Sequence, residues 1–172
     1  MAPKPAKKDP SKTEQYNKVV EQATLGDIQL TSLKFDVKPD FFSSDSKRKL
    51  RYDVNLQAIE FEASVGLAVA SLTLSVIGTT GKKKALHCSA DYSVVYGNLK
   101  DCDREAVEAF LDRVAKFACF PYFRSLFSSL DWSAGLQLPP LPVLKEPVRQ
   151  ALPKATRPSP RSVSTRTDAP AD

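Results

Sequence analysis

The sequence predicts an α+β fold in which a four-stranded antiparallel β-meander is followed by a long, proline-interrupted helix packed on the sheet. Three observations support this prediction. Four segments between residues 28 and 96 alternate apolar and polar side chains, as strands with one wet face do. No helical pattern separates them, which disfavours a parallel sheet. Apolar residues then recur at three- and four-residue spacing over residues 103–133.

The distribution of proline sets the expected domain limits. A chain of 172 residues allows one domain with tails. Of its 13 prolines, only Pro39 and Pro121 lie between residues 11 and 138. We therefore predict a disordered basic leader at residues 1–12, a folded domain at 13–152, and a disordered basic tail rich in Pro, Ser and Thr at 153–172.

The first half of the domain reads as one short helix and four strands. Residues 13–25 place Tyr16, Val19 and Val20 at helical spacing, and Gly26 is expected to end this helix. Strands are predicted at about 28–37, 49–62, 64–77 and 85–96, with a bulge near Thr31 in the first. The glycines and lysines of residues 78–84 are typical of a turn between the last two strands.

The second half reads as helix followed by an extended segment. Asp103 is a suitable N-cap for a helix over 103–133, and Pro121 is expected to kink or break it. Gly135 closes the helix. Residues 136–144 are apolar, but Pro139, Pro140 and Pro142 forbid a helix, so this segment is predicted to lie extended as a lid.

Charge and cysteine content bound the environment. The net charge is +5, but its excess lies in residues 1–18 and 143–172, so a nucleic-acid-binding surface built into the fold is not indicated. Three cysteines without a CxxC pair argue against a disulfide framework. No secretory signal is evident, and the apolar run at residues 63–78 is too short to span a bilayer. A cytoplasmic protein is expected.

The search for catalytic residues gives little. His87 is the only histidine, and its neighbour Cys88 points to the other side of a strand, so we expect a histidine that is buried or at a sheet edge. The GTTGKKK segment lacks the spacing of a P-loop. Helix capping accounts for the pair Asp101 and Asp103. We therefore expect no enzyme activity, no metal and no cofactor.

Apolar residues exceed what one helix on one sheet can bury. Seven of the fifteen aromatic residues lie between Phe110 and Trp132. Phe127 and Trp132, the exposed-looking pair Phe41 and Phe42, and the LPPLPVL segment are therefore expected to line an oligomer interface or an apolar groove.

One pair of motifs points to a family. The CFPYFR segment of residues 119–124, followed after a helix-length spacer by LPPLPVL at 138–144, resembles the signature of SecB-type export chaperones. The resemblance covers roughly residues 27–152. The Leu-Pro-Pro-Leu version is also similar to the SecB-like chaperones of toxin–antitoxin systems.

The resemblance implies an ATP-independent holdase that is a homotetramer, a dimer of dimers. Its partners would be unfolded client polypeptides, among them a preprotein for export or an antitoxin to be protected. The client groove of the family carries over onto the helix, the second strand and the lid. These residues are Tyr122, Phe127 and Leu130; Leu50, Tyr52 and Val54; and Leu138, Leu141, Val143 and Leu144. Apolar excess adds Trp132, Phe41 and Phe42.

Three departures from export SecB qualify the resemblance. Export SecB proteins are acidic where they contact the motor SecA, so the near-neutral body and basic tail of this chain argue against SecA binding. The C-terminal helix is short, and the helix at 13–25 has no counterpart. Two other functions stay open. Lys7, Lys8, Lys82, Lys83, Lys84 and the arginines of the tail allow nucleic-acid binding, and the same groove allows a small apolar ligand.

Overall fold

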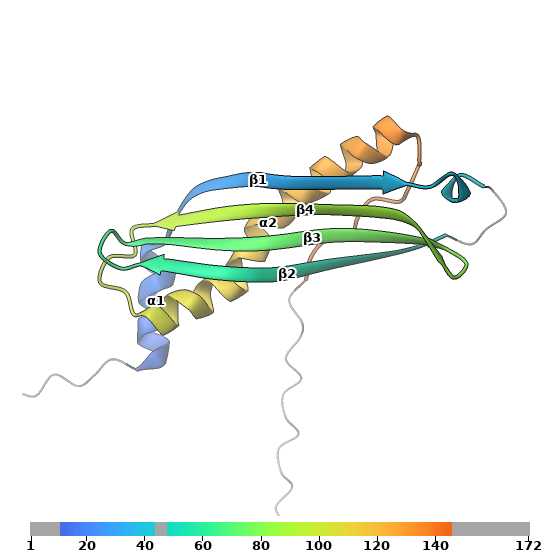
Figure 1. The fold of residues 1–172 in the computed structure, drawn as a ribbon. Coiled ribbons are helices and arrows are strands. Elements are labelled where there is room, and N and C mark those ends of the chain that lie inside the picture. Colours follow the sequence, from blue (N-terminus) through green and yellow to red (C-terminus); the bar gives the residue numbers. More distant parts are fainter. Residues whose placement is uncertain (1–10, 44–47, 146–172) are drawn as a thin grey trace, which may run out of the picture.

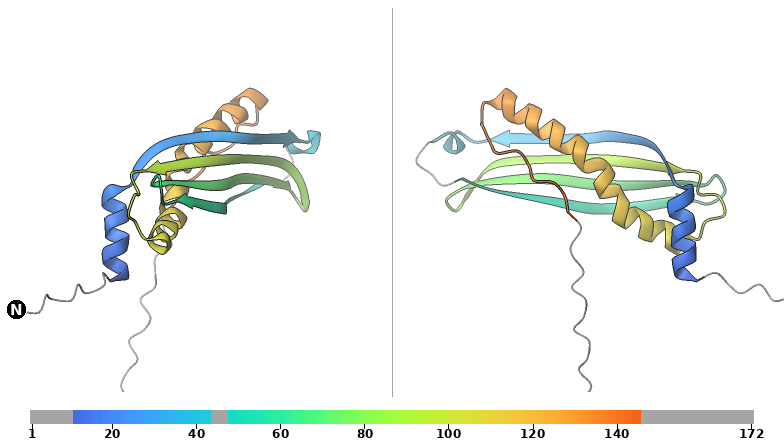
Figure 2. Two further views of the ribbon diagram at one scale, coloured as in Figure 1. Left: turned by 60° about the vertical axis from the view of Figure 1, so that its left-hand side comes forward. Right: turned by 180° about the vertical axis from the view of Figure 1, so that it is seen from behind.

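The computed structural model describes residues 11–43 and 48–145, and both predicted disordered tails lie almost entirely outside these ranges. It consists of a helix, four long strands and a second, longer helix. Helix α1 spans Lys12–Gln22 and α2 spans Arg104–Ala134. The strands are β1 (Thr24–Val37), β2 (Arg48–Glu62), β3 (Leu67–Thr80) and β4 (Lys83–Gly97), and the 3-10 helix η1 (Pro39–Phe41) follows β1. Figures 1 and 2 show that α2 crosses one face of the sheet diagonally and leaves the other face open.

The antiparallel sheet is confirmed, but its strand order is not that of a meander. The order is β1-β4-β3-β2, so β1 pairs with β4 and both β1 and β2 are edge strands. The cause lies in the connection that follows β1. Helix η1 packs against the ends of β3 and β4 and buries Phe41 there, which carries the chain past the sheet to its far edge. The assumption that sequential strands pair was wrong for β1.

Strand β1 contains two irregularities. The register shifts between Leu30 and Ser32, which confirms the bulge predicted near Thr31. The Thr31 hydroxyl donates to the carbonyl of Asp91 across the ladder at 3.1 Å. A second shift between Leu25 and Asp27 places Gly26 inside β1, so this glycine does not end α1 as expected.

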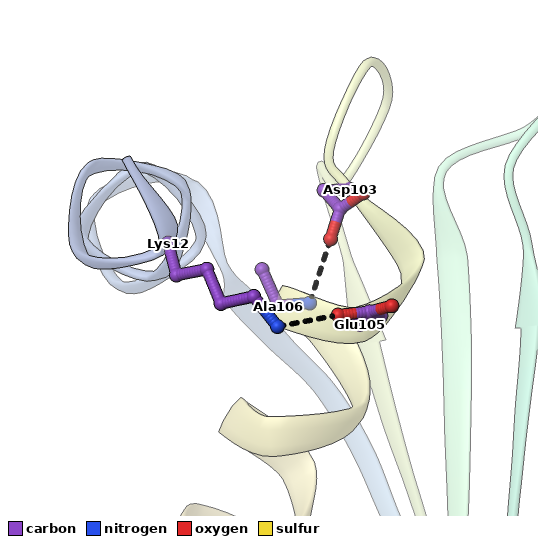
Figure 3. A network of polar contacts seen from close by, with 4 residues as sticks. All are labelled: Lys12, Asp103, Glu105 and Ala106. Carbon is purple, nitrogen blue, oxygen red and sulfur yellow. Dashed lines mark hydrogen bonds and ion pairs between the residues drawn. The ribbon is translucent and has the colours of Figure 1, made fainter. Parts of the chain in front are cut away.

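Helix α1 is fixed at its N-terminal end. Ser11 is the N-cap and forms a reciprocal capping box with Glu14, so the helix begins at Lys12, a residue of the predicted leader. Lys12 reaches Glu105 of α2 at 3.2 Å (Figure 3), an exposed ion pair that contributes little to stability. The side chain of Val19 is fully buried and joins α1 to the hydrophobic core.

Helix α2 is one continuous helix. The Asp103 side chain accepts the backbone N–H of Ala106 at 3.1 Å (Figure 3), and Gly135 ends the helix in the left-handed conformation, as predicted. The helix does not break at Pro121, because buried side chains on both sides of it, such as Cys119 and Phe123, hold the two halves to the same sheet. The proline itself is exposed.

The core lies between α2 and the covered face of the sheet. Leu72, Leu74 and Val76 of β3 pack there with Tyr96 of β4, whose ring meets Phe110 edge-on at 5.3 Å. Among the described residues, no polar or charged side chain is buried. His87 is exposed on the open face of the central strand β4, so the expectation of a buried or edge histidine was wrong, while Cys88 faces the core.

Candidate functional site

A cavity of about 580 Å³ lies between the C-terminal half of α2 and the extended residues 136–145, which we call the proline strip. The right-hand view of Figure 2 shows the strip leaving the end of α2 and running back across the sheet beside the helix. The residues that line the cavity come from α2 and the proline strip. They are Phe120, Pro121, Arg124, Ser125, Phe127, Ser128, Ser129, Asp131, Leu138, Pro139, Pro140, Leu141 and Val143.

Hydrogen bonds at the end of α2 position the proline strip. After the left-handed turn at Gly135, the N–H of Leu136 donates to the carbonyl of Asp131 at 3.1 Å. The carboxylate of Asp131 accepts the N–H of Leu138 at 3.1 Å, and the guanidinium of Arg48 donates to the carbonyl of Leu136 at 3.3 Å. The prolines that follow have no N–H to donate and keep the strip extended.

The cavity combines an apolar interior with a hydroxyl-rich rim. Phe120, Phe127 and Leu141 are buried and provide the interior. Ser125, Ser128 and Ser129 are exposed at the rim. This arrangement suits a ligand with an apolar side chain on a polar backbone, because the side chain leaves water while the backbone keeps polar neighbours.

Four of the residues predicted for a groove line this cavity: Phe127, Leu138, Leu141 and Val143. Tyr52 lies next to it, because its ring is 6.2 Å from that of Phe120. A further group is partly buried against the core without lining the cavity, namely Leu50, Val54, Leu130 and Leu144.

The structure separates the other predicted residues from the cavity. With about 3.6 residues per turn, Tyr122 and Leu130 lie on the opposite flank of α2 from Arg124 and Ser128. Trp132 is 88% exposed and is not part of the lining.

The two neighbouring phenylalanines have different surroundings. Phe41 is fully buried at 0% exposure, so the expectation that it is exposed was wrong. Phe42 is 49% exposed and lies outside the cavity lining.

Sequence reasoning found only Phe127 on the helix side of the cavity and missed the other helix residues that line it. Phe120, Arg124, Phe127, Ser128 and Asp131 follow one another at helical spacing and face the strip together. That spacing was visible in the sequence, but the small and charged members of the set do not stand out as an apolar stripe.

The described residues give no indication of catalytic chemistry. Burial raises the pKa of the Cys88 thiol to about 11 and that of Cys119 to about 12, which keeps both protonated at neutral pH. Within residues 11–43 and 48–145, no group of His, Cys, Asp and Glu could hold a metal ion. No helix of the described chain is long and apolar enough to cross a membrane.

Comparison with known proteins gives matches to solved structures only. No protein-family model and no curated sequence matches the chain. The fold is similar to that of the Mycobacterium tuberculosis Rv1957 SecB-like chaperone, solved in complex with a ChAD peptide from the Rv1956 HigA1 antitoxin. The TM-score is 0.62 at 16% identity, over 78% of this chain and 98% of that chain. A Streptococcus agalactiae protein of unknown function gives a TM-score of 0.38 at 8% identity, over 72% of this chain and 97% of that chain.

Proposed function

Because the chain has a SecB-like α+β fold, we propose that it is an ATP-independent holdase chaperone for unfolded or aggregation-prone polypeptides. The observation that carries this proposal is the cavity between α2 and the proline strip, whose buried lining residues are all apolar. A site of this kind binds through buried apolar area, at roughly 25 cal/mol per Å², and needs few specific polar contacts. It therefore suits clients of varied sequence.

The surroundings of the cavity support an extended client. Strand β2 is a sheet edge, and Tyr52 on this strand contacts Phe120 of the cavity. An extended polypeptide that places an apolar side chain in the cavity would lie close to this edge and could add backbone hydrogen bonds to it.

An antitoxin segment is the client that we propose first, ahead of a preprotein for export. The SecB-like chaperone of similar fold is in complex with an antitoxin peptide. The described body is close to neutral in charge, so we propose no contact with SecA. Such a chaperone would act in the cytoplasm.

Replacing Val143 with serine tests the cavity as the client site. Val143 lines the cavity and is 62% exposed, so its loss leaves the fold intact while it removes apolar surface from the site. We expect Val143→Ser to weaken binding of an unfolded client by about 1–3 kcal/mol. Fluorescence anisotropy with a labelled unfolded client, together with suppression of client aggregation, measures this loss.

A matched control for this experiment is Val65→Ser. Val65 is 67% exposed in the turn between β2 and β3, and it does not line the cavity. Equal client affinity in the two variants would refute the cavity as the binding site. Leu141 is less suitable, because it is only 4% exposed and contributes to the core.

We propose that the chaperone assembles as a homotetramer, a dimer of dimers. The edge strand β1 carries three exposed leucines on the helix side of the sheet, Leu25, Leu30 and Leu33, which no element of the described chain covers. Pairing of β1 with a second copy would cover these leucines and satisfy the free edge. The polar outer face of α2 would form the second interface.

Sedimentation velocity tests this assembly. We expect a tetramer for the full chain and a shift to smaller species for Leu30→Lys, which places a charge at the β1 edge. Leu67→Lys is the control, because Leu67 is similarly exposed but lies on β3. A wild-type chain that sediments only as a monomer at micromolar concentration would contradict the proposal.

A further inference from the structure

One end of the sheet carries a dense cluster of positive charge. The end of β1, the start of β2 and the hairpin between β3 and β4 meet there (Figure 1). In the register, Lys49, Thr79 and Lys84 form one row, and Arg51 lies opposite Ile77 in a neighbouring row. Exposed cationic residues of this region, which we call the cationic end, are Lys34, Lys38, Arg48, Lys49, Arg51, Lys82, Lys83 and Lys84.

Most of these cations form no ion pair with another of the described residues. Arg48 lies over the Phe41 ring at 5.2 Å and bonds the carbonyl of Leu136, so it is engaged. For the other seven, no carboxylate of the described residues lies within ion-pair distance. Strands stand roughly 4.8 Å apart, so their charges repel one another across the sheet. Such repulsion favours a partner that neutralises it.

The cationic end differs in charge from the rest of the open face, which is the side of the sheet that α2 leaves uncovered. The middle of this face carries small hydroxyl side chains such as Ser71, Thr73 and Ser93, and its far end carries the carboxylates of Glu60 and Glu62. No helix within residues 11–43 and 48–145 covers the face (Figure 1). The near-neutral body therefore contains strongly segregated charge, which the expectation drawn from net charge alone did not foresee.

We propose that the cationic end is a docking surface for an acidic segment of another polypeptide. Complementary charge on a flat, uncovered surface increases the rate and the specificity of such an encounter. Most of this surface lies on the open side of the sheet and at its end, although Arg48 and Lys83 belong to a row of the covered face, and the cavity lies on the covered side. The inference is therefore independent of the proposed holdase function.

Two features favour an acidic polypeptide over nucleic acid. Asp36 and Asp53 lie among the cations on the open face. They would repel a phosphate chain, which carries a charge at every unit. The carboxylates of an acidic peptide can be spaced so that they bind the lysines and arginines without lying beside these two aspartates. Apart from the His87 ring, the open face of the described strands carries no ring on which bases could stack. The other aromatic side chains of these strands belong to the register rows of the covered face, and these are Phe35, Tyr52, Phe61, Tyr92 and Tyr96.

Charge reversal in the hairpin tests the proposal. The variant Lys82→Glu/Lys84→Glu is compared with Lys12→Glu/Lys100→Glu, which makes the same change of net charge at the α1 end of the molecule. Binding of a labelled poly-glutamate peptide to the full chain is measured at low and at raised salt. We expect about a tenfold loss of affinity or more in the hairpin variant, and about a twofold change or less in the control.

The remaining measurements decide between the outcomes. Raised salt should weaken the peptide binding of the wild type, and both variants should still suppress aggregation of an apolar client. Equal loss in the two variants would mean that only overall charge matters and would overturn the proposal. Tighter binding of an oligouridine RNA than of poly-glutamate, lost in the hairpin variant, would overturn it in favour of nucleic acid.

Discussion

Replacing Phe41 with alanine is expected to lower the free energy of unfolding by about 3–5 kcal/mol, the range for removing a buried aromatic side chain. Phe41 is fully buried, and it lies so close to β3 that a Cβ atom on Gly78 would come within 2.8 Å of its ring. Arg48 of β2 lies over the same ring at 5.2 Å. Phe41 thus joins the η1 connection to three strands, and its loss leaves a cavity there.

The adjacent residue provides the control. Phe42 is 49% exposed, so Phe42→Ala should cost less than about 1 kcal/mol. Urea unfolding followed by circular dichroism measures both variants. Similar losses at the two positions would show that Phe41 is not the residue that anchors the connection between β1 and β2.

Replacing Gly66 with alanine is expected to cost about 2–4 kcal/mol, from left-handed backbone strain and from overpacking. Gly66 has a φ of 68°. An added Cβ would lie 2.5 Å from the backbone nitrogen of Lys100 and 3.0 Å from its Cα. The carbonyl of Gly66 accepts the N–H of Leu99 at 3.0 Å, so the clash would separate the β2–β3 turn from the segment that leads into α2.

Gly81→Ala separates these two contributions. Gly81 has a φ of 60° but no atom within 4 Å of its hypothetical Cβ. It therefore suffers only the conformational cost of about 1–2 kcal/mol. In thermal and urea unfolding, the Gly66→Ala variant should have a clearly lower free energy of unfolding than the Gly81→Ala variant. Equal destabilisation would mean that the contact with Lys100 relaxes freely.

The sequence revealed the elements of this fold better than their pairing. Alternation along β2, β3 and β4 is a local property, and the caps at Asp103 and Gly135 mark the ends of α2 within a turn. The pairing of β1 with β4 depends instead on where η1 places the chain, and no local pattern encodes that. Pro121 is similar, because its local preference to break the helix is outweighed by the burial of Cys119 and Phe123 on either side.

The residues that line the cavity were also predicted only in part, because some of them are recognisable from a local motif and others are not. Leu138 and Val143 were found because the proline-rich motif is visible in the sequence, and both line the cavity. Arg124 and Ser128 were missed because they line it only through the path of the strip beside α2. Phe41 and Phe42 are identical neighbours in the sequence, and only their packing distinguishes a core residue from a surface residue.

The position of β1 in the sheet also determines the order in which the chain can fold. Thr24 pairs with Gly97 and Val37 with Leu86, so the whole ladder of β1 joins residues far apart in the sequence. During synthesis, β1 leaves the ribosome well before its partner exists, whereas β2, β3 and β4 are joined by tight hairpins. Loop-closure entropy therefore makes the docking of β1 a late and slow step. Until then, a protein that we propose as a chaperone exposes the apolar face of one of its own strands.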